Sequence, residues 1–249
     1  MLRRQCAALV AWIALSACTG GTTAFAPLPA GGHHVLFIGN SLTYVNDLPG
    51  TLAGLAAAAG DTIRTTTVAF PDYALEDHLA QGDAARAIAV GGWQYVVMQQ
   101  GPSAVEANRQ NLIQKTIAFD AQVRAAGGRS ALYSVWPQSV NIADFPRSIA
   151  SYKMAADAVH GLFLPVGSAW QAAWARDPAL SLYQGDGLHP TGIATYLAAA
   201  VMFERITGKD ARTLPGGAVV GGATLSASTA TVRLLQDAAH DANAQFPVP

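Results

Sequence analysis

Three side chains of this 249-residue chain have the chemical types that nucleophilic catalysis needs. Ser41 follows Gly39 and Asn40 directly after an apolar run, and Asp186 and His189 lie three residues apart much later in the chain. A serine hydroxyl is a poor nucleophile at neutral pH until a base takes its proton, and that base needs an acid to hold its tautomer. We therefore predict that Ser41 is a nucleophile, that His189 is its base and that Asp186 orients the imidazole.

These three residues need a scaffold that brings distant segments of the chain together. Short apolar or β-branched runs predict five strands, at residues 35–38, 62–70, 95–98, 130–135 and 162–166. Helical patterns lie between and after them, at residues 52–59, 75–90, 105–126, 149–160, 191–206 and 229–246. Strands that alternate with helices indicate βαβ units, and therefore a mostly parallel sheet covered by helices on both faces.

The predicted fold is an α/β three-layer α/β/α sandwich. Its five-stranded sheet is expected to have the flavodoxin-like strand order 2-1-3-4-5, in which ligands bind at the carboxyl ends of the strands. Ser41 follows the first strand, Gln99 and Gln100 follow the third, and Asp186 and His189 lie beyond the fifth. We therefore expect all five residues to lie at the same edge of the sheet.

The two motifs resemble those of the SGNH (GDSL-type) hydrolases. Residues 39–43, Gly-Asn-Ser-Leu-Thr, are similar to the first block of that family, and residues 186–189, Asp-Gly-Leu-His, to its last block. The resemblance implies a three-layer fold and ester hydrolysis through an acyl-enzyme on Ser41, without a metal or another cofactor. The chain does not resemble the α/β-hydrolase elbow Gly-x-Ser-x-Gly, because Thr43 stands where the second glycine is needed.

The predicted oxyanion hole begins with the backbone N–H of Ser41. In the second block of the family a glycine N–H contributes to this hole, but residues 70–75 stand here and contain no glycine. A backbone N–H does not require glycine, so we predict that Asp72 or Tyr73 donates it. The carboxylate of Asp72 must then point away from the developing negative charge.

The third block of the family, Gly-x-Asn-Asp, is replaced by residues 97–101, Val-Met-Gln-Gln-Gly. A carboxamide N–H suits an oxyanion hole because it donates a hydrogen bond without bringing charge. Gln99 is the first candidate for this donor and Gln100 the second. Two other side chains near this edge are interpreted as structural, His78 as a solvated helix residue and Trp136 as a packing residue.

The start of the chain predicts export. A basic pair precedes an apolar run that is too short to span a bilayer, and Cys18 follows small residues at the end of this run. The pattern resembles a bacterial lipoprotein signal, with a signal peptide at residues 1–17, a lipidated Cys18 and a flexible tether at residues 18–32. The alternative is an ordinary secretory signal with a chance cysteine. The hydrolase-like domain is predicted at residues 33–249, in the bacterial cell envelope or periplasm.

Composition limits the possible partners. The net charge is −1, charged residues make up 12% of the chain and no basic stripe is present, so nucleic acid is not an expected partner. The membrane is expected to be contacted through the lipid anchor alone. The predicted function is hydrolysis of a short acyl ester or an acylated glycan. Two alternatives stay open: a catalytically idle glycan-binding lipoprotein, and an acyltransferase that uses the same site.

Overall fold

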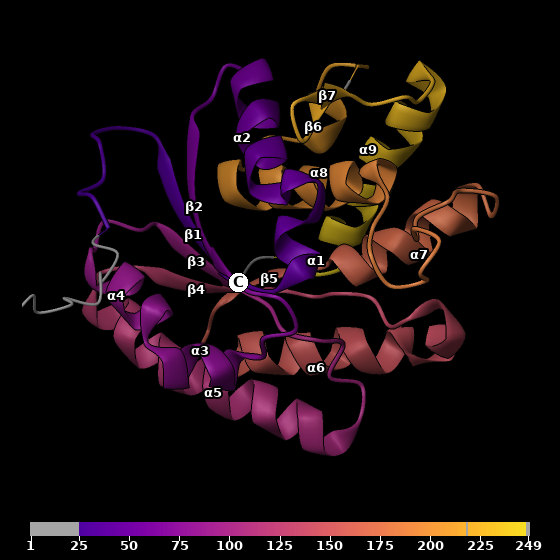
Figure 1. Cartoon of the computed structure of the whole chain (residues 1–249). Coiled ribbons are helices and arrows are strands. Elements are labelled where there is room, and N and C mark those ends of the chain that lie inside the picture. The colour runs from indigo at the N-terminus through magenta and orange to yellow at the C-terminus, as the bar shows by residue number, and fades with distance from the viewer. Residues whose placement is uncertain (1–24, 218, 248–249) are drawn as a thin grey trace, which may run out of the picture.

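The computed structural model describes residues 25–217 and 219–247 (Figure 1). Its central layer is a parallel sheet with the order β2-β1-β3-β4-β5, which confirms the predicted fold class and strand order. The strands are β1 (His33–Gly39), β2 (Ile63–Ala69), β3 (Tyr95–Met98), β4 (Arg129–Tyr133) and β5 (Leu162–Leu164).

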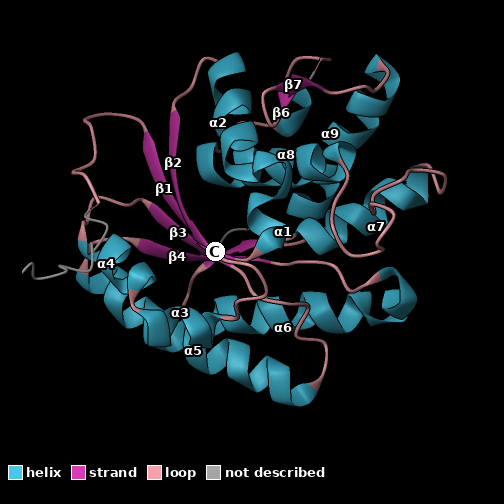
Figure 2. Ribbon diagram, viewed as in Figure 1, coloured by secondary structure: helices cyan, strands magenta, loops and turns pink. Residues whose placement is uncertain are grey.

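Helices cover both faces of the sheet, as Figure 2 shows. One face carries α2 (Leu48–Ala58), α8 (Gly192–Thr207) and α9 (Thr229–Ala244), with α7 (Val166–Arg176) packed beside α8 and α9. The other face carries α3 (Leu75–Gln81), α4 (Asp83–Ala89), α5 (Glu106–Ala125) and α6 (Phe145–Ala158). The sheet is therefore buried on both sides, which is why its strands read as continuous apolar runs in the sequence.

The register of the central strands places the functional segments side by side. Ile38 of β1 lies opposite Met98 of β3, so the residues that follow these two strands leave the sheet at the same edge. After β1 the chain turns at once into the short helix α1 (Ser41–Tyr44) and the 3₁₀ turn η1 (Val45–Asp47). The nucleophile predicted from the sequence therefore lies at the carboxyl edge of the sheet.

Two segments differ from the prediction. The helix α7 was not predicted, because the fifth strand was extended to Val166, which is instead the first residue of that helix. Its buried positions Val166, Ala169, Trp170 and Ala173 have helical spacing. The glycine-rich loop before the last helix also contains a small hairpin of β6 (Val219–Val220) and β7 (Ala223–Thr224).

The predicted signal peptide and Cys18 lie outside the described residues. Within the described part of the predicted tether, Phe25 and Leu28 pack against the core of the domain. No helix among the described residues is long and apolar enough to cross a membrane.

Candidate active site

The structure brings Ser41, His189 and Asp186 into one chain of hydrogen bonds. His189 Nε2 lies 2.9 Å from Ser41 Oγ, and His189 Nδ1 lies 2.6 Å from Asp186 Oδ2. An ionised Asp186 can only accept, so the proton of the neutral imidazole sits on Nδ1 and Nε2 is left to accept from the serine hydroxyl. This order of nucleophile, base and orienting acid is the arrangement that activates a serine.

The turn that carries Ser41 is built around Asn40. Asn40 is the N-cap of α1, and its Oδ1 accepts a hydrogen bond from the backbone N–H of Leu42 at 3.1 Å. Its carbonyl accepts from the backbone N–H of Thr43 at 2.9 Å. These bonds fix the first turn of the helix, so Ser41 is held at its first position, at the end of the central strand.

The side chain of Gln99 holds this turn from within the core and does not serve as an oxyanion donor. Its side chain is fully buried, and its Oε1 accepts from Asn40 N at 3.1 Å and from Thr43 Oγ1 at 2.8 Å. Its Nε2 donates to Asn40 Oδ1 and to the carbonyl of Gln100, both at 2.7 Å. The backbone donor and backbone acceptor fix the orientation of this carboxamide. The prediction that Gln99 points at the oxyanion is therefore wrong, since both of its N–H groups are already used.

Gln100, the second candidate, does not line the cleft beside Ser41 either. Its Oε1 accepts from Leu75 N at 3.2 Å, and its Nε2 donates to Ser103 Oγ at 3.0 Å. The backbone N–H of Gln100 donates to the Tyr152 hydroxyl at 3.0 Å. Both glutamines therefore hold the loop after β3 in place, where the sequence predicted that one of them would contact the substrate.

The loop at residues 70–75 does reach the cleft. Asp72 and Tyr73 both line the same cleft as Ser41. Asp72 has a φ of +60°, a left-handed conformation that glycine adopts most easily, in the loop where the family has a glycine. Asn40 Nδ2 donates to the Tyr73 carbonyl at 3.0 Å and so ties this loop to the Ser41 turn. The backbone N–H of Tyr73, the alternative donor, is already used, since it donates to the Phe70 carbonyl at 3.4 Å. Among the described residues, the backbone N–H groups of Ser41 and Asp72 donate to no protein acceptor, so they stay the predicted oxyanion donors.

The cleft beside Ser41 has a volume of about 390 Å³ and a polar lining. Its described lining residues include no lysine or arginine, and their polar side chains are two carboxylates, four carboxamides and three hydroxyls: Asp72, Asp144, Asn40, Asn108, Gln138, Asn141, Ser41, Tyr73 and Ser103. A second hollow of about 400 Å³ adjoins it and shares residues 101–103 with it. The site is therefore open to a polar group larger than a small acyl chain.

The loop that carries the acid and the base is held by its own backbone. Asp186 Oδ1 accepts from Leu188 N at 2.9 Å and from His189 N at 3.0 Å, across a turn in which Gly187 has a φ of +68°. The hydrogen bond from His189, followed by those from the two backbone N–H groups, lowers the pKa of Asp186 to about 2. Asp186 is therefore ionised at neutral pH and can stabilise the imidazolium that forms during the reaction.

Comparison with known proteins places this geometry in a fold family. No family model matches the chain, and no curated protein matches it. Among solved structures, a DUF4886 family protein from Bacteroides uniformis is 19% identical, with a TM-score of 0.72 over 87% of this chain and 96% of that one. A candidate SGNH hydrolase from Slackia heliotrinireducens is 26% identical, with a TM-score of 0.58 over 70% of this chain and 99% of that one. The chain has the SGNH hydrolase fold.

A third structure of this fold comes from an enzyme with a named substrate. It is a catalytic mutant of an acetylxylan esterase from Geobacillus stearothermophilus, 16% identical, with a TM-score of 0.54 over 74% of this chain and 97% of that one. At this level of identity the likeness concerns the fold. The chemistry of this protein depends on its own residues.

The structure places His78 in the core, whereas the sequence predicted a solvated helix residue. It is fully buried rather than solvated, and its ring packs against Phe70 and Tyr73. Its Nε2 lies 2.8 Å from the carbonyl of Gly39, which can only accept, so Nε2 carries the proton. Burial lowers the pKa of His78, and its Nδ1 has no hydrogen-bond partner among the described residues. His78 is therefore a neutral side chain that supports the strand end before Ser41.

Trp136 is also buried, as the interpretation of a packing residue requires. Its ring stacks on Trp170 with the centroids 4.0 Å apart. Its Nε1 donates to the carbonyl of Leu188 at 2.8 Å, so it anchors the loop that carries His189. The aromatic core and the catalytic loop are thus joined by one side chain.

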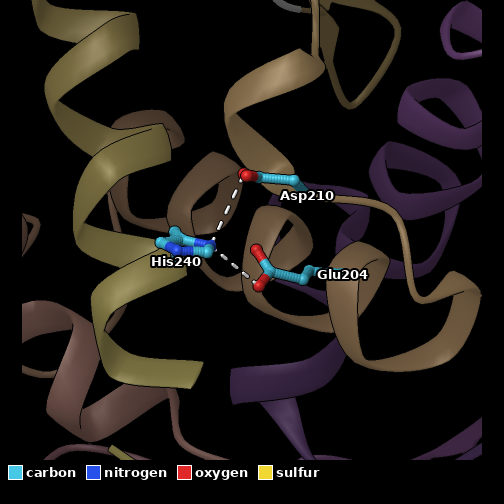
Figure 3. Close-up of side chains that lie close together, drawn as sticks. All are labelled: Glu204, Asp210 and His240. Carbon is cyan, nitrogen blue, oxygen red and sulfur yellow. Dashed lines mark hydrogen bonds and ion pairs between the residues drawn. The ribbon is translucent and has the colours of Figure 1, made fainter. Parts of the chain in front are cut away.

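One group of three side chains in the described part of the chain has the types that bind metals. His240 Nδ1 lies 3.0 Å from Glu204 Oε1 and 3.5 Å from Asp210 Oδ1 (Figure 3). However, the Arg212 guanidinium already pairs with Asp210, and Ala211 N donates to Glu204 Oε2 at 2.9 Å. A metal cation here would lie beside that guanidinium charge. The group therefore ties α8 and α9 together, and none of its three residues lines the cleft beside Ser41.

Proposed function

We propose that this protein is a serine esterase that cleaves acyl esters through an acyl-enzyme on Ser41. The observation that carries the proposal is the continuous hydrogen-bonded chain from Ser41 through His189 to Asp186. His189 Nε2 takes the proton of Ser41 as Oγ attacks the ester carbonyl, and Asp186 keeps the imidazole in the required tautomer. The negative charge on the carbonyl oxygen is stabilised by the backbone N–H groups of Ser41 and Asp72.

The reaction then proceeds in two steps, release of the alcohol and hydrolysis of the acyl-enzyme. When the tetrahedral intermediate collapses, His189 returns its proton to the departing alcohol oxygen, and the acyl group stays bonded to Ser41 Oγ. A water molecule next attacks the acyl-serine while His189 accepts one of its protons. Collapse releases the carboxylic acid and returns the proton to Ser41. In the acyltransferase alternative, a hydroxyl of an acceptor replaces this water, so product analysis separates the two activities.

The lining of the cleft favours a substrate whose alcohol part is polar and uncharged. None of the described lining residues is a lysine or arginine that could pair with an anionic group, while Asn108, Gln138 and Asn141 can exchange hydrogen bonds with hydroxyls. The second hollow gives such a group room to continue past the first binding position. We therefore propose a short acyl ester of a carbohydrate as the substrate class, in line with the acetylxylan esterase among the similar structures.

We further propose that the protein is exported and anchored to the membrane by a lipid on Cys18. The described chain packs on the core from Phe25 and enters the sheet at the start of β1, at its amino edge, whereas Ser41 follows the carboxyl end of that strand. An anchor on the N-terminal segment would therefore join the domain at the edge opposite the cleft. The site would then act on material in the envelope space and not on the lipids of the anchoring membrane.

The first test uses p-nitrophenyl acetate turnover and labelling by a fluorophosphonate. We expect the wild type to show both, and Ser41→Ala to lose labelling and at least about 1,000-fold in kcat. Ser139→Ala is the matched control, because the residue bonds Gly187 only through its backbone N–H, and we expect it to stay near the wild-type rate. A folded wild type that is silent in both assays would refute the esterase proposal and favour the glycan-binding alternative.

A further inference from the structure

Asn46 connects the segment that carries Ser41 to the segment that carries His189. It lies in η1, shortly after Ser41 in the chain. Its Nδ2 donates to the carbonyl of Pro190, the residue after His189, at 2.8 Å. The same Nδ2 donates to Thr195 Oγ1 in α8 at 3.0 Å. One carboxamide therefore joins two loops that are far apart in sequence and that must meet for the proton transfer.

The backbone conformation of Asn46 is unusual and serves this connection. Asn46 and Asp47 have φ angles of +57° and +50°, so two successive residues other than glycine are left-handed. This region is uncommon for residues with a side chain, and asparagine and aspartate tolerate it best. The Asp47 carboxylate caps α2 through Gly50 N at 3.0 Å, whereas the Asn46 side chain reaches the neighbouring loop. Only Asn46 of this pair contacts the catalytic loop.

The acceptors around Asn46 require a donor at this position. The Pro190 carbonyl also accepts from Gln184 Nε2 at 2.9 Å, and Thr195 Oγ1 donates to the carbonyl of Thr191 at 3.1 Å. The Pro190 carbonyl oxygen and Thr195 Oγ1 can therefore each accept a hydrogen bond from Asn46 Nδ2. An aspartate at position 46 has the same shape but would place an oxygen against the Pro190 oxygen, which is repulsive.

We infer that Asn46 is a positioning residue that holds His189 within hydrogen-bonding distance of Ser41. The bonds inside the His189 loop fix its shape, and Trp136 attaches it to the aromatic core. Asn46 fixes the loop relative to the segment that carries the nucleophile. The kinetic effects expected from this inference rest on the proposed esterase function, since the rate of proton transfer from Ser41 falls steeply when the base is misplaced.

The test removes the carboxamide without disturbing the backbone. Glycine adopts the left-handed conformation freely, so Asn46→Gly keeps the turn and deletes both hydrogen bonds. We expect kcat and the rate of fluorophosphonate labelling to fall about 10- to 100-fold with KM within about twofold of the wild type. Asn46→Asp should lose a comparable factor. Asp47→Gly is the matched control, because it removes the hydrogen bond that caps α2 and leaves the Asn46 carboxamide in place, and it should leave kcat within about twofold.

A second measurement does not depend on activity. The backbone N–H groups of Gly187, Leu188 and His189 all donate within the loop, so their hydrogen exchange reports how firmly the loop is held. We expect faster exchange at these three amides in Asn46→Gly than in the wild type and in Asp47→Gly. Equal exchange, or a kcat loss no larger than that of the control, would overturn the inference. A wild type without esterase activity would refute the proposed function, while the exchange result would still decide the role of Asn46.

Discussion

The turn that carries Ser41 and the loop that carries His189 are stabilised in different ways. Beneath Ser41, the residues Asn40, Thr43 and Gln99 are 7%, 1% and 0% exposed, and their side chains bond to one another. In the other loop the side chains of Asp186 and His189 are 48% and 26% exposed. The first segment is therefore part of the core, and the second is a surface loop with a shape set by local bonds.

This difference determines what a substitution should disturb. A buried hydrogen-bonding group that loses its partner keeps the full cost of its burial, so changes beneath Ser41 should lower stability and activity together. An exposed group that loses a partner is rehydrated by water. Changes in the His189 loop should therefore lower activity with little effect on stability.

The largest expected effect is that of Asp186→Asn. The asparagine Oδ1 can still accept from Leu188 N and His189 N, so the loop keeps its shape. Its amide N–H, however, faces His189 Nδ1 and favours the wrong tautomer. We expect kcat to fall on the order of 1,000- to 10,000-fold with Tm nearly unchanged, measured with p-nitrophenyl acetate and by thermal melting.

Asp210→Asn is the matched control for this loss of a carboxylate. The pKa of Asp210 is also lowered to about 2, first by the hydrogen bond from Arg212, and the residue lies away from the cleft. The contribution of such a carboxylate to folding is present above about pH 4 and is lost as the pH falls towards 2, and for the exposed Asp186 solvent screening keeps it small. Asp210→Asn should leave kcat unchanged. A large fall in kcat in the control, or a large fall in Tm in Asp186→Asn, would contradict the comparison.

The sequence was sufficient to predict the sheet and the edge of it at which Ser41, Asp186 and His189 meet. An uninterrupted apolar run marks β1 as a strand buried on both faces, and the strand ends then place Ser41 and His189 at one edge. Strand ends do not predict the role of a side chain that can point either into the cleft or into the core. Gln99 follows β3 as predicted, but Asn40 N and Thr43 Oγ1 compete for its carboxamide and draw it beneath the turn.

Two other features were missed for different reasons. The helical spacing of α7 was present in the sequence, and so was a boundary, because Pro165 separates β5 from the first residue of the helix, but the apolar run was read through this proline as one strand. The role of Asn46 depends on a positive φ and on a partner far along the chain, and neither has a local signature. Contacts across the fold therefore decide the supporting residues, whereas local patterns decide the strands.

The next largest effect is expected for Gly39→Ala. A Cβ at this position would overlap Gln99 Oε1 and lie 2.5 Å from Thr43 Oγ1, so it would displace the buried network beneath Ser41. We expect the free energy of unfolding to fall by about 1–3 kcal/mol, together with a loss of kcat. Gly54→Ala is the control, because this exposed helix position has no atom within 4 Å of an added Cβ and should gain up to about 1 kcal/mol. Normal activity in a destabilised Gly39→Ala would contradict the coupling.

The smallest effect is a change in how stability depends on pH. Burial lowers the pKa of His78, and the hydrogen bond to the Gly39 carbonyl and the nearby Asp77 carboxylate offset this only in part, so the unfolded chain binds a proton there more readily than the folded one. Stability should then fall as the pH drops below about 6.5, the ordinary value in the unfolded chain.

In His78→Gln the side-chain Nε2 can still donate to the Gly39 carbonyl but does not titrate, so Tm should fall less between pH 7 and pH 5 than in the wild type. His160→Asn is the control, because His160 is an exposed, left-handed residue and asparagine tolerates that conformation. It should keep the wild-type slope. If His78→Gln keeps that slope as well, His78 does not couple protonation to the stability of the Ser41 turn.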